Sequence, residues 1–424
     1  MWSGAGIVIA NMIGAGVFLS AGFMAQDLDP QWILLAWVVG SIIALAGARA
    51  YGTLAQIVPR SGGEYRYLSD LLHPFAGYAA GWTSLLVGFA APIALDALVA
   101  GAFLKILLPA VEPLAVAVAL IVALTALHAA RLTWSRRTQN VLVVVKLILI
   151  LAFVFIGLSL GSMDWPQWQA PNRTGEFPLA PFMGSLFFIA FAFSGWNAAA
   201  YAAEEFRSPR DVSRAMLIGC AFVAVLYLIL NWILVANLTP ERATVVFTYE
   251  TARITLGHLV MTDLLGARGA AVMSVLIIVA FISAMSAMIL AGPRVYAAMA
   301  ADGFLPRALR GREGMPPIGS VILQGVAALI IVFTHEVRTI LLSIGAILTL
   351  FSALTCLSLI ALWFRPRALP KPDTGSVIAA AIHFLAGVWM LYFGFRESAT
   401  LLLWVAAGAG AAFVSYLLSR RRSA

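Results

Sequence analysis

The sequence predicts an all-α integral membrane protein with twelve transmembrane helices. Hydrophobic residues make up 62% of the 424 residues and charged residues only 11%, which is far more apolar than an average soluble domain. Apolar stretches of about 20 residues, the length that crosses a hydrocarbon core about 30 Å thick, recur along almost the whole chain. Lys and Arg gather in every second loop between these stretches, as the topology of a multi-pass protein requires.

Twelve segments are long and apolar enough to span a bilayer. They use most of the chain, so no soluble domain of any size fits between them. The first segment is not followed by a small-residue cleavage site and a mature soluble chain, so it is not a signal peptide. The expected spans are residues 3–25, 32–57, 75–108, 113–130, 139–161, 179–205, 212–237, 269–300, 318–335, 338–364, 376–395 and 399–419.

The net charge of +8 is explained by the loops rather than by a nucleic-acid partner. Nineteen of the 27 Lys and Arg residues fall in one set of alternating segments, against seven in the other set. The positive-inside rule then places both termini in the cytoplasm, for a multi-pass protein of the cell (inner) membrane. Binding of nucleic acid would need these arginines on one folded face, which short alternating loops do not supply.

Cysteine and histidine give no sign of a metal or a cofactor. Cys220 and Cys356 both lie inside spans, where cysteine behaves as a small hydrophobic residue, and no disulfide is expected. The five histidines are scattered near span ends, where an interfacial position is the simplest interpretation. We therefore expect no metal site and no cofactor.

The first span carries glycine where a membrane helix needs its strongest helix formers. Gly14-Ala15-Gly16 stands in the middle of the apolar run 7–20, and each glycine costs a helix about 1 kcal/mol. A break at this depth leaves backbone groups unpaired, which is tolerated only inside protein or beside a cavity. The pattern therefore indicates a ligand site; glycines that let a neighbouring helix approach closely are the alternative.

Residues 59–72 are too polar to span the membrane. Apolar side chains at Tyr65, Leu68, Leu71 and Leu72 follow a Ser-Gly-Gly hinge. This pattern predicts a short amphipathic helix on the cytoplasmic face, with an ordinary interfacial loop as the alternative.

The third span is about 35 residues long, so it must tilt or project beyond the bilayer. Asp96 lies in its outer half. This depth favours contact with the outer headgroups over a position inside the bundle, and we assign Asp96 no catalytic role.

Lys146 is the one formal cation well inside a span. It lies about nine residues beyond Arg137, or about 13 Å along a helix, and a charge at such depth costs roughly 2.5–3.5 kcal/mol on insertion scales. Residues of this kind usually face the interior with a partner. We favour that position over a side chain that extends back to the cytoplasm.

The sixth span breaks in its middle, as the first does. Ser194-Gly195 interrupts it beside Trp196 and Asn197. Five spans separate the two breaks, and an odd number of spans inverts the topology. The sequence therefore predicts a five-plus-five inverted repeat in which discontinuous helices 1 and 6 open the two halves, a pattern that points to a transporter site at the bilayer midplane.

The repeat divides the chain into three parts. Residues 1–161 form the first half with helices 1–5, and residues 179–364 form the second half with helices 6–10. Residues 373–424 hold helices 11 and 12, to which we assign a peripheral position or a role in contacts between copies. The longest outer loop, about 238–267, has mixed charges and no clear fold.

Four separated stretches resemble one known family. They are Ile13-Gly-Ala-Gly-Val-Phe18, Pro59-Arg-Ser-Gly-Gly-Glu-Tyr65, Phe191-Ala-Phe-Ser-Gly-Trp-Asn197 followed by Glu204-Glu205 and Pro209, and the segment from Arg294 to Asp302-Gly-Phe-Leu-Pro306. In this order they are similar to the amino acid–polyamine–organocation (APC) superfamily of transporters, and within it to the L-type amino acid transporter branch. The resemblance implies a LeuT-like fold.

The resemblance also implies how a substrate amino acid is held between the two breaks. The N–H groups at the start of the second half-helix suit a carboxylate, and carbonyl groups at the end of the first suit an ammonium. By this resemblance the substrate carboxylate is bound by Gly14, Ala15 and Gly16, and the substrate amine by the carbonyl groups of Ile13, Phe191, Ala192 and Ser194. Phe191 resembles an aromatic gate over the substrate, and Asn197 a polar group beside it.

Lys146 resembles the lysine that replaces a bound cation in sodium-independent members. The match is in the spacing from Gln139 to Lys146, and the resemblance places the ammonium near Ser283, Ser286 and the first break. Sodium coupling is thus disfavoured, which leaves exchange or symport with protons.

The chain departs from the family in three places. Animal members carry a loop cysteine between helices 3 and 4 that links to a heavy subunit, but residues 109–113 have none, so no disulfide-linked heavy subunit is expected. The cytoplasmic leader before the first span is nearly absent, so we expect the natural chain to begin further upstream. An acidic position of helix 2 is Thr53 here, which weakens any gating scheme built on that acid.

We expect a transporter of neutral amino acids, because the helix 1 and helix 6 residues named above include no acid to balance a cationic side chain. A polyamine or cationic amino acid transporter of the same fold is the alternative, with Asp96 or a helix 10 group supplying the charge. A membrane enzyme would need clustered catalytic residues within the spans, and a channel would not need paired helix breaks. Both are disfavoured.

Overall fold

The computed structural model describes residues 2–130, 132–171, 176–311, 317–333, 337–365 and 370–397, with residues 406, 409–410, 412–414 and 416–417. Every regular element in this part of the chain is a helix. Nine of the described helical segments are long and apolar enough to cross a membrane, and two shorter apolar helices accompany them. These eleven correspond to the first eleven expected spans, whereas the twelfth, 399–419, lies largely outside the described residues.

The first half of the chain begins with an interrupted helix and continues through long spans. Proline stands in the first turn of several of these helices, where its missing N–H costs nothing. The elements are α1 (Trp2–Met12), α2 (Ala15–Met24), α3 (Pro30–Ile57), α4 (Glu64–Leu71), α5 (Pro74–Thr83), the π-helical η1 (Ser84–Ala90), α6 (Ala91–Leu107), α7 (Pro113–Ala130) and α8 (Leu132–Leu160).

The second half again begins with an interrupted helix. Its last span, α17, lies beyond the predicted repeat. The elements are α9 (Leu179–Ala192), α10 (Ala198–Tyr201), the 3-10 turn η2 (Ala203–Glu205), α11 (Pro209–Ala236), α12 (Pro240–Thr248), α13 (Glu250–Ile254), α14 (Leu256–Ala301), the 3-10 turn η3 (Arg307–Leu309), α15 (Ile318–Val332), α16 (Val337–Phe364) and α17 (Thr374–Glu397).

Two expectations about the connecting segments have clear outcomes. The amphipathic helix predicted within residues 59–72 is present as α4, with Tyr65 and Leu68 buried. The outer segment 238–267, expected to lack a clear fold, instead forms α12, α13 and the start of α14, which bends at Gly266. A local signal for α12 is the Thr239 side chain, which accepts a hydrogen bond from the first-turn N–H of Arg242 and so caps the helix.

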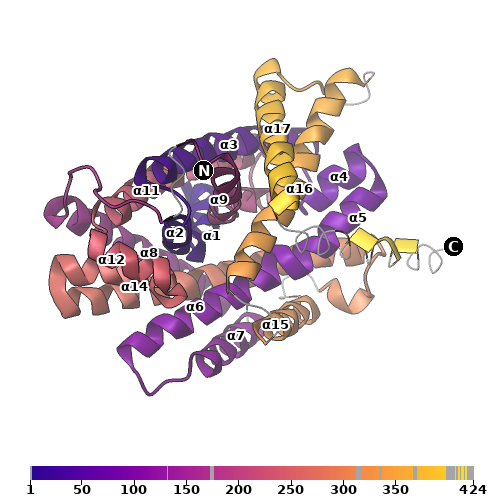
Figure 1. Cartoon of the computed structure of the whole chain (residues 1–424). Coiled ribbons are helices and arrows are strands. Elements are labelled where there is room, and N and C mark those ends of the chain that lie inside the picture. The colour runs from indigo at the N-terminus through magenta and orange to yellow at the C-terminus, as the bar shows by residue number, and fades with distance from the viewer. Residues whose placement is uncertain are drawn as a thin grey trace.

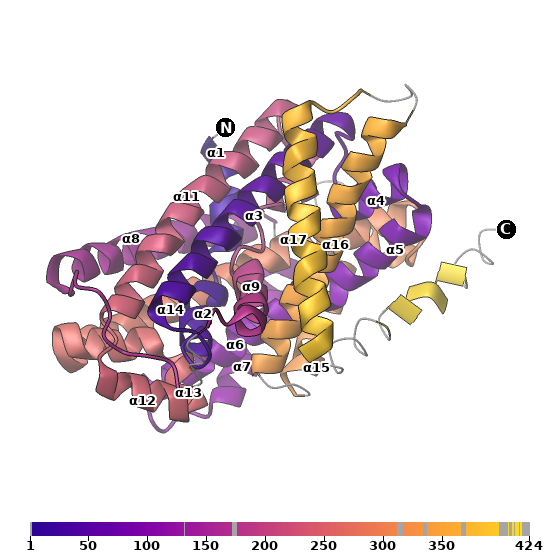
Figure 2. The ribbon, with the colours of Figure 1, turned by 45° about the horizontal axis from the view of Figure 1, so that its top comes forward.

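The interrupted first helix lies in the interior of the bundle. α1 packs against α11 and α14, and α2 packs against α9, α13 and α14, so that neighbouring helices enclose both (Figure 1). After a 45° turn, α3 is seen to run beside α11 on one side and α17 on the other (Figure 2). This central placement surrounds the first break with protein.

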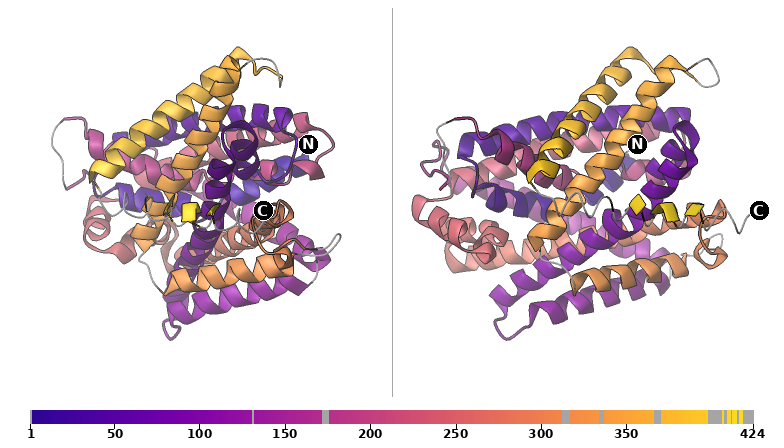
Figure 3. Two further views of the ribbon diagram at one scale, coloured as in Figure 1. Left: turned by 90° about the vertical axis from the view of Figure 1, so that its right-hand side faces the viewer. Right: turned by 45° about the vertical axis from the view of Figure 1, so that its right-hand side comes forward.

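The outer helices face the surroundings with apolar side chains. Along α8, exposed residues recur at intervals of three and four and form one stripe, as a lipid-facing helix requires. They are Val141, Val144, Ile148, Leu151 and Phe155. At the periphery, α7 packs beside α15, and α16 packs beside α17 on the opposite side of the bundle (Figure 3).

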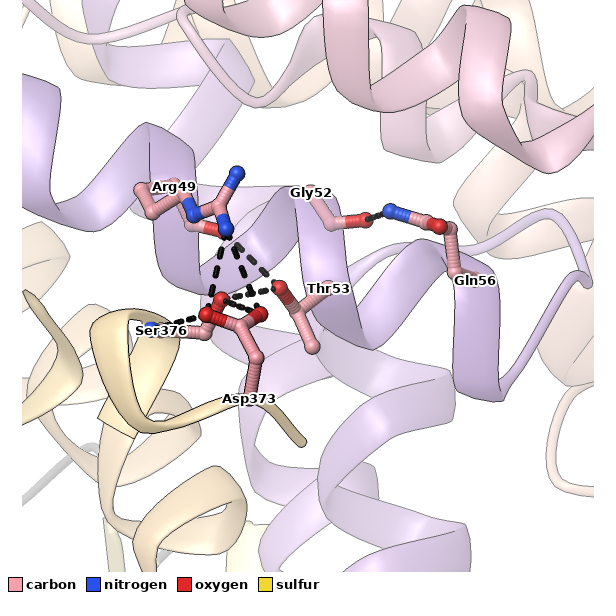
Figure 4. Close-up of polar contacts among 6 residues, drawn as sticks. All are labelled: Arg49, Gly52, Thr53, Gln56, Asp373 and Ser376. Carbon is pink, nitrogen blue, oxygen red and sulfur yellow. Dashed lines mark hydrogen bonds and ion pairs between the residues drawn. The ribbon is translucent and has the colours of Figure 1, made fainter. Parts of the chain in front are cut away.

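The start of α17 is fastened to α3 by a polar cluster (Figure 4). Asp373 accepts hydrogen bonds from the Ser376 hydroxyl at 2.6 Å and the Ser376 N–H at 3.0 Å, and Arg49 of α3 lies 3.2 Å from the same carboxylate. The two bonds from Ser376, followed by the Arg49 charge, lower the pKa of Asp373 below its usual value. Thr53 adds a hydroxyl contact of 2.7 Å to Ser376. Thr53 therefore contacts the start of α17.

Candidate functional site

The first membrane helix is interrupted at Ile13 and Gly14. α1 ends at Met12 and α2 begins at Ala15, and Gly14 between them is extended, with φ −140° and ψ −153°. Glycine supplies no side-chain acceptor at this N-cap position, so the first N–H groups of α2 depend on other groups for hydrogen bonds. The break lies where the sequence predicts it, with Ala15 and Gly16 wound into the first turn of α2.

The second interruption covers residues 193–197, between α9 and α10. Gly195 has a φ of 101°, a conformation that residues with a Cβ rarely adopt. A Cβ on Gly195 would also lie 2.8 Å from the carbonyl carbon of Asn11 in α1. The turn thus needs glycine both for its backbone angle and for its close approach to the first helix.

The two interruptions meet inside the bundle. Gly16 packs so closely on Ala192 that a Cβ at residue 16 would overlap the Ala192 backbone. The fully buried hydroxyl of Tyr227, from α11, lies 2.6 Å from the carbonyl oxygen of Met12 and 3.0 Å from that of Ala192. One side chain therefore bonds to the end of α1 and to the end of α9.

Lys146 faces this junction from α8. Its side chain is fully buried, and its ammonium group donates hydrogen bonds of 2.8 Å to the carbonyl oxygens of Ala10 and Ile13. The ammonium thus sits at the C-terminal end of α1, where a helix dipole is negative. The side chain does not extend back to the surface of the protein.

Three of the four carbonyl groups assigned to a substrate amine already accept a hydrogen bond. The oxygen of Ile13 accepts from Lys146, that of Ala192 from Tyr227, and that of Phe191 from the Ser194 N–H at 2.9 Å. Because a carbonyl oxygen has two lone pairs, each can still accept a second donor.

Asp96 lies inside the bundle, contrary to the expectation that it reaches the outer headgroups. Its side chain is fully buried, and its carboxylate oxygens are 3.7 and 3.8 Å from the position that a Cβ on Gly14 would occupy. Asp96 is eleven residues from the C-terminal end of α6, about 16 Å along a helix, which is too deep for its short side chain to reach that end. An acid therefore borders the first break and interacts electrostatically with Lys146.

The two serines predicted near Lys146 are both fully buried on α14. The Ser286 hydroxyl lies 2.9 Å from Nε2 of His128 on α7, and the Ser283 hydroxyl has no hydrogen-bond partner among the described residues. His128 is itself buried, so its expected interfacial position was wrong. The cause is that α7 packs against α14 and covers the imidazole.

A cavity of about 90 Å³ lies beside the second break, with room for several water molecules. Two of the predicted substrate residues, Ser194 and Asn197, line it. The other six, at positions 13–16 and 191–192, lie outside the lining that the structure describes. Further polar side chains in the wall come from four other elements, α1, α4, α16 and α17: Asn11, Glu64, Thr349, Ser352 and His383.

Glu64 is the acid of this cavity. It is 3% exposed, and its Oε1 accepts hydrogen bonds from the Tyr51 hydroxyl at 2.7 Å and from the Asn197 amide at 3.1 Å. Burial raises the pKa of Glu64 to about 7, although the bonds from Tyr51 and Asn197 lower it in part. A carboxyl group that can change its charge near neutral pH therefore stands beside the second break.

α17 contributes to the same cavity, which differs from the peripheral position expected for helix 11. His383, Gly387 and Met390 line the wall. His383 is buried, with Nδ1 2.9 Å from the Ile43 carbonyl oxygen and Nε2 2.9 Å from the Ser352 hydroxyl. Like His128, it is interior rather than interfacial, because α17 packs against both α3 and α16.

Sequence reasoning missed Glu64, Tyr227 and the interior position of Asp96. Asp96 did carry a signal, because an ionisable residue within a span is by default a functional candidate. Tyr227 carried a weaker one, as a lone hydroxyl in the long apolar run of α11. Glu64 had no local signal, since its partners lie 13 and 133 residues away.

Comparison with known proteins gives a family match over almost the whole chain. The model of a family described as amino acid permease matches residues 1–417. Large neutral amino acids transporter small subunit 2 from Mus musculus is 26% identical over 406 residues, which cover 92% of this chain and 75% of that protein.

Two further relatives are similar at the same level. Asc-type amino acid transporter 1 from Mus musculus is 24% identical over 409 residues, which cover 92% of this chain and 74% of the relative. The b(0,+)-type amino acid transporter 1 from Mus musculus is 24% identical over 405 residues, with 92% of this chain and 80% of the relative covered. All three relatives are named as amino acid transporters.

Proposed function

Because the chain belongs to the amino acid permease family, it is a multi-pass membrane transporter and not an enzyme, and we propose that it moves neutral amino acids across the cell membrane by alternating access. The proposed moving parts are the two inverted halves, residues 1–161 and 179–364. Substrate binds between them at the two helix breaks. Both termini lie in the cytoplasm in this proposal.

The observation that carries the proposal is the meeting of two interrupted helices inside the bundle. Such breaks expose backbone N–H and C=O groups, which the interior of a membrane protein tolerates only in a protected site. The Tyr227 contacts to Met12 and Ala192 hold the two breaks together. A zwitterion fits this junction because it offers an anion to the start of α2 and an ammonium to nearby carbonyl groups.

The proposed assignment of groups follows the two poles of the substrate. The carboxylate binds the N–H groups of Gly14, Ala15 and Gly16 at the start of α2. The amine binds carbonyl oxygens of Ile13, Phe191, Ala192 and Ser194. Phe191 covers the substrate, and Asn197 contributes a polar group from the cavity wall.

Lys146 supports a sodium-independent mechanism. Its ammonium bonds to two carbonyl oxygens at the end of α1, so a fixed positive charge already occupies a place where a bound cation would stabilise the same break. Ser283 and Ser286 on the neighbouring α14 belong to this site in the proposal. Transport is then driven by exchange or by protons.

The charges at the first break favour a substrate without net charge. Asp96 and Lys146 are both buried there with opposite sign, and together they balance. A net charge on the substrate would add an uncompensated buried charge, which is costly. The name of the large neutral amino acids relative agrees with this choice.

A polyamine or cationic amino acid transporter is the second candidate, and Asp96 is the observation that favours it. Its carboxylate lies beside Gly14, where it could pair with an added ammonium on the substrate. This candidate predicts that putrescine or arginine competes with leucine for uptake. The main proposal predicts weak competition by both.

We also propose that no partner is attached through a disulfide. Cys220 and Cys356 are both free and buried, which supports this expectation for the two cysteines of the chain. One relative is named as a small subunit, and that name describes the assembly of the relative. A non-covalent partner is compatible with the proposal.

Uptake by purified protein in proteoliposomes tests the function. Vesicles loaded with unlabelled leucine should exchange it for labelled leucine outside, equally well in sodium and in choline buffers. Empty vesicles without protein are the control for leakage. Absence of exchange for leucine, serine and alanine alike, together with rapid uptake of putrescine, would replace the main proposal by the second candidate.

A further inference from the structure

The segment around Glu64 clasps the cytoplasmic half of the second broken helix. The Ser61 hydroxyl accepts a hydrogen bond of 3.1 Å from the Glu204 N–H. Gly63 packs against the ring of Tyr201, where a Cβ would lie 2.5 Å from two ring carbons. With the bond from Asn197 to Glu64, three successive contacts run along this stretch, and we call them the cytoplasmic clamp.

The clamp is also tied to the end of α14. Tyr65 and Arg66, which follow Glu64 on α4, both bond to the carboxylate of Asp302. α4 therefore connects the broken helix on one side with the long α14 on the other. A change at Glu64 acts where these two elements are joined.

The groups that face Glu64 are neutral at physiological pH. They are Tyr51 from α3, Tyr67 from α4 itself, Asn197 and Tyr201 beside the second break, and Cys356 from α16. His383 of α17 lines the same cavity but bonds to Ile43 and Ser352. Among the described residues this buried carboxylate has hydrogen-bond donors but no countercharge, so a proton is the ligand that best neutralises it.

We propose that Glu64 is the proton-binding site of the transporter, and that it binds a proton while the cytoplasmic clamp is closed and releases it when the clamp opens, so that substrate movement is coupled to a proton gradient. This inference rests on the proposed transport function and names its driving ion. The proton passes from water in the cavity to the carboxylate, which becomes a neutral carboxylic acid.

The environment of Glu64 links opening of the clamp to release of the proton. In the closed clamp burial raises the pKa of Glu64 to about 7, although the charge-assisted bonds from Tyr51 and Asn197 lower it in part. When the clamp opens, cytoplasmic water solvates Glu64, its pKa returns towards the ordinary value of 4.5, and the proton leaves. The closed clamp therefore takes up a proton near neutral pH, and the open clamp releases it.

Accumulation against a gradient measures the coupling. Proteoliposomes are given labelled leucine outside and an interior one pH unit more alkaline, with the membrane potential held at zero by potassium and valinomycin. One proton per substrate then allows about tenfold accumulation relative to vesicles without a gradient. The measured quantity is the ratio of leucine accumulated with the pH gradient to leucine accumulated without it. We expect this ratio to be well above one for the wild type. It should be near one for Glu64→Gln, which keeps the shape of the side chain but cannot carry the proton.

The matched control is Asp70→Asn. Asp70 is an exposed acid on the same helix and pairs with Arg60 at the surface. This variant should keep the wild-type ratio, and a pH-sensitive dye inside the vesicles should still report protons entering with leucine. A Glu64→Gln ratio equal to that of the wild type would overturn the proposal.

A second pair of variants decides the matter if Glu64→Gln does not fold. Tyr51→Phe removes a donor that stabilises the charged form of Glu64, so the midpoint of the pH profile of uptake should move to higher pH. Tyr67→Phe is the control. The Tyr67 ring is buried, with its centroid 5.8 Å from that of the Tyr51 ring, and its hydroxyl has no hydrogen-bond partner among the described residues. The midpoint of this control should stay at the wild-type value, and equal midpoints for both variants would contradict the assignment.

The same vesicles separate this inference from the transport function. Wild-type exchange of leucine without accumulation under the pH gradient would leave the function standing and refute the role of Glu64. Absence of exchange in any mode would refute the function itself, and the inference with it.

Discussion

The ammonium group of Lys146 donates a 2.8 Å hydrogen bond to the carbonyl oxygen of Ile13, inside the first helix break. A second bond of the same length goes to Ala10. The end of α1 is therefore held by a charge from α8, and loss of that charge leaves two buried carbonyl groups without this donor. A bond to a charged group contributes about 1.5–3 kcal/mol.

Lys146→Ala should lower leucine uptake at least about tenfold, because about 1.4 kcal/mol already corresponds to a factor of ten. Folding should be largely intact, as judged by a single peak in size-exclusion chromatography. The control is Lys105→Ala, which changes an exposed lysine in the last turn of α6. Wild-type uptake by Lys146→Ala would refute its role as a cation surrogate.

Gly195→Ala should inactivate the transporter and lower its melting temperature in detergent. The strained φ of 101° costs an alanine about 1–3 kcal/mol, and the new Cβ would also press on Asn11. Gly303→Ala is the matched control, because its φ is 83° but a Cβ there meets no atom within 4 Å. A larger loss at Gly195 than at Gly303 isolates the contact between the two broken helices; equal losses would mean that this contact contributes nothing.

Asp96→Asn should shift selectivity towards acidic amino acids. The variant leaves the charge of Lys146 without its partner, so the first break becomes net positive. Two unit charges in contact, about 4 Å apart, interact by about 4 kcal/mol at an effective dielectric constant of about 20, and the interaction weakens in proportion to their distance. We therefore expect glutamate to compete for leucine uptake at least about tenfold better than in the wild type. Asp263→Asn, at an exposed acid paired with Arg242, should leave the competition unchanged.

The stability of the folded protein should fall as the pH rises from about 4.5 to about 7. Burial raises the pKa of Glu64 from 4.5 to about 7, so the folded state binds its proton more tightly than the unfolded state. This contribution of Glu64 to the free energy of unfolding is about 3 kcal/mol. It is complete below pH 4.5 and is lost as the pH rises past 7.

Melting temperatures in detergent between pH 4.5 and 8 measure this dependence. Glu64→Gln should flatten the profile and be more stable than the wild type at pH 8, whereas Asp70→Asn should keep the wild-type slope. Parallel profiles for the wild type and Glu64→Gln would show that the pKa of Glu64 is the same in the folded and the unfolded protein.

The helix breaks and most of the spans could be predicted because their signals are local. Gly14 and Gly195 each stand in an apolar run that is otherwise strongly helical, and the cost of glycine in a helix does not depend on distant residues. The inward position of Lys146 followed from its depth along a single helix. In each case the information lies within about 20 consecutive residues.

The composition of the cavity could not be predicted, because it depends on which helices pack together. Glu64 was hidden in a polar linker, and only the approach of α3 and the second break makes it a buried acid. His128 and His383 looked interfacial by position, and packing against α14 and α16 buries them. Asp96 was misplaced because its distance of eleven residues from the end of the helix at Leu107 was not compared with the short reach of its side chain.

The π-helical segment η1 is another feature with no signal in the sequence. It occupies residues 84–90 in the middle of the third span, and two of its residues, Gly88 and Phe89, line the cavity. Such segments widen a helix locally and are frequent at functional sites. Gly88 has no side chain, so it leaves space in the cavity wall at this widened part of the helix.

Because α17 forms part of the cavity wall, it belongs to the shortest chain that could function. A chain shortened to end at Phe364 would retain both of the proposed halves, yet it would lack His383, Gly387 and Met390. Lipid tails or detergent would then fill the opened side of the cavity. The two proposed halves alone therefore do not enclose the cavity, and any minimal engineered version has to include α17.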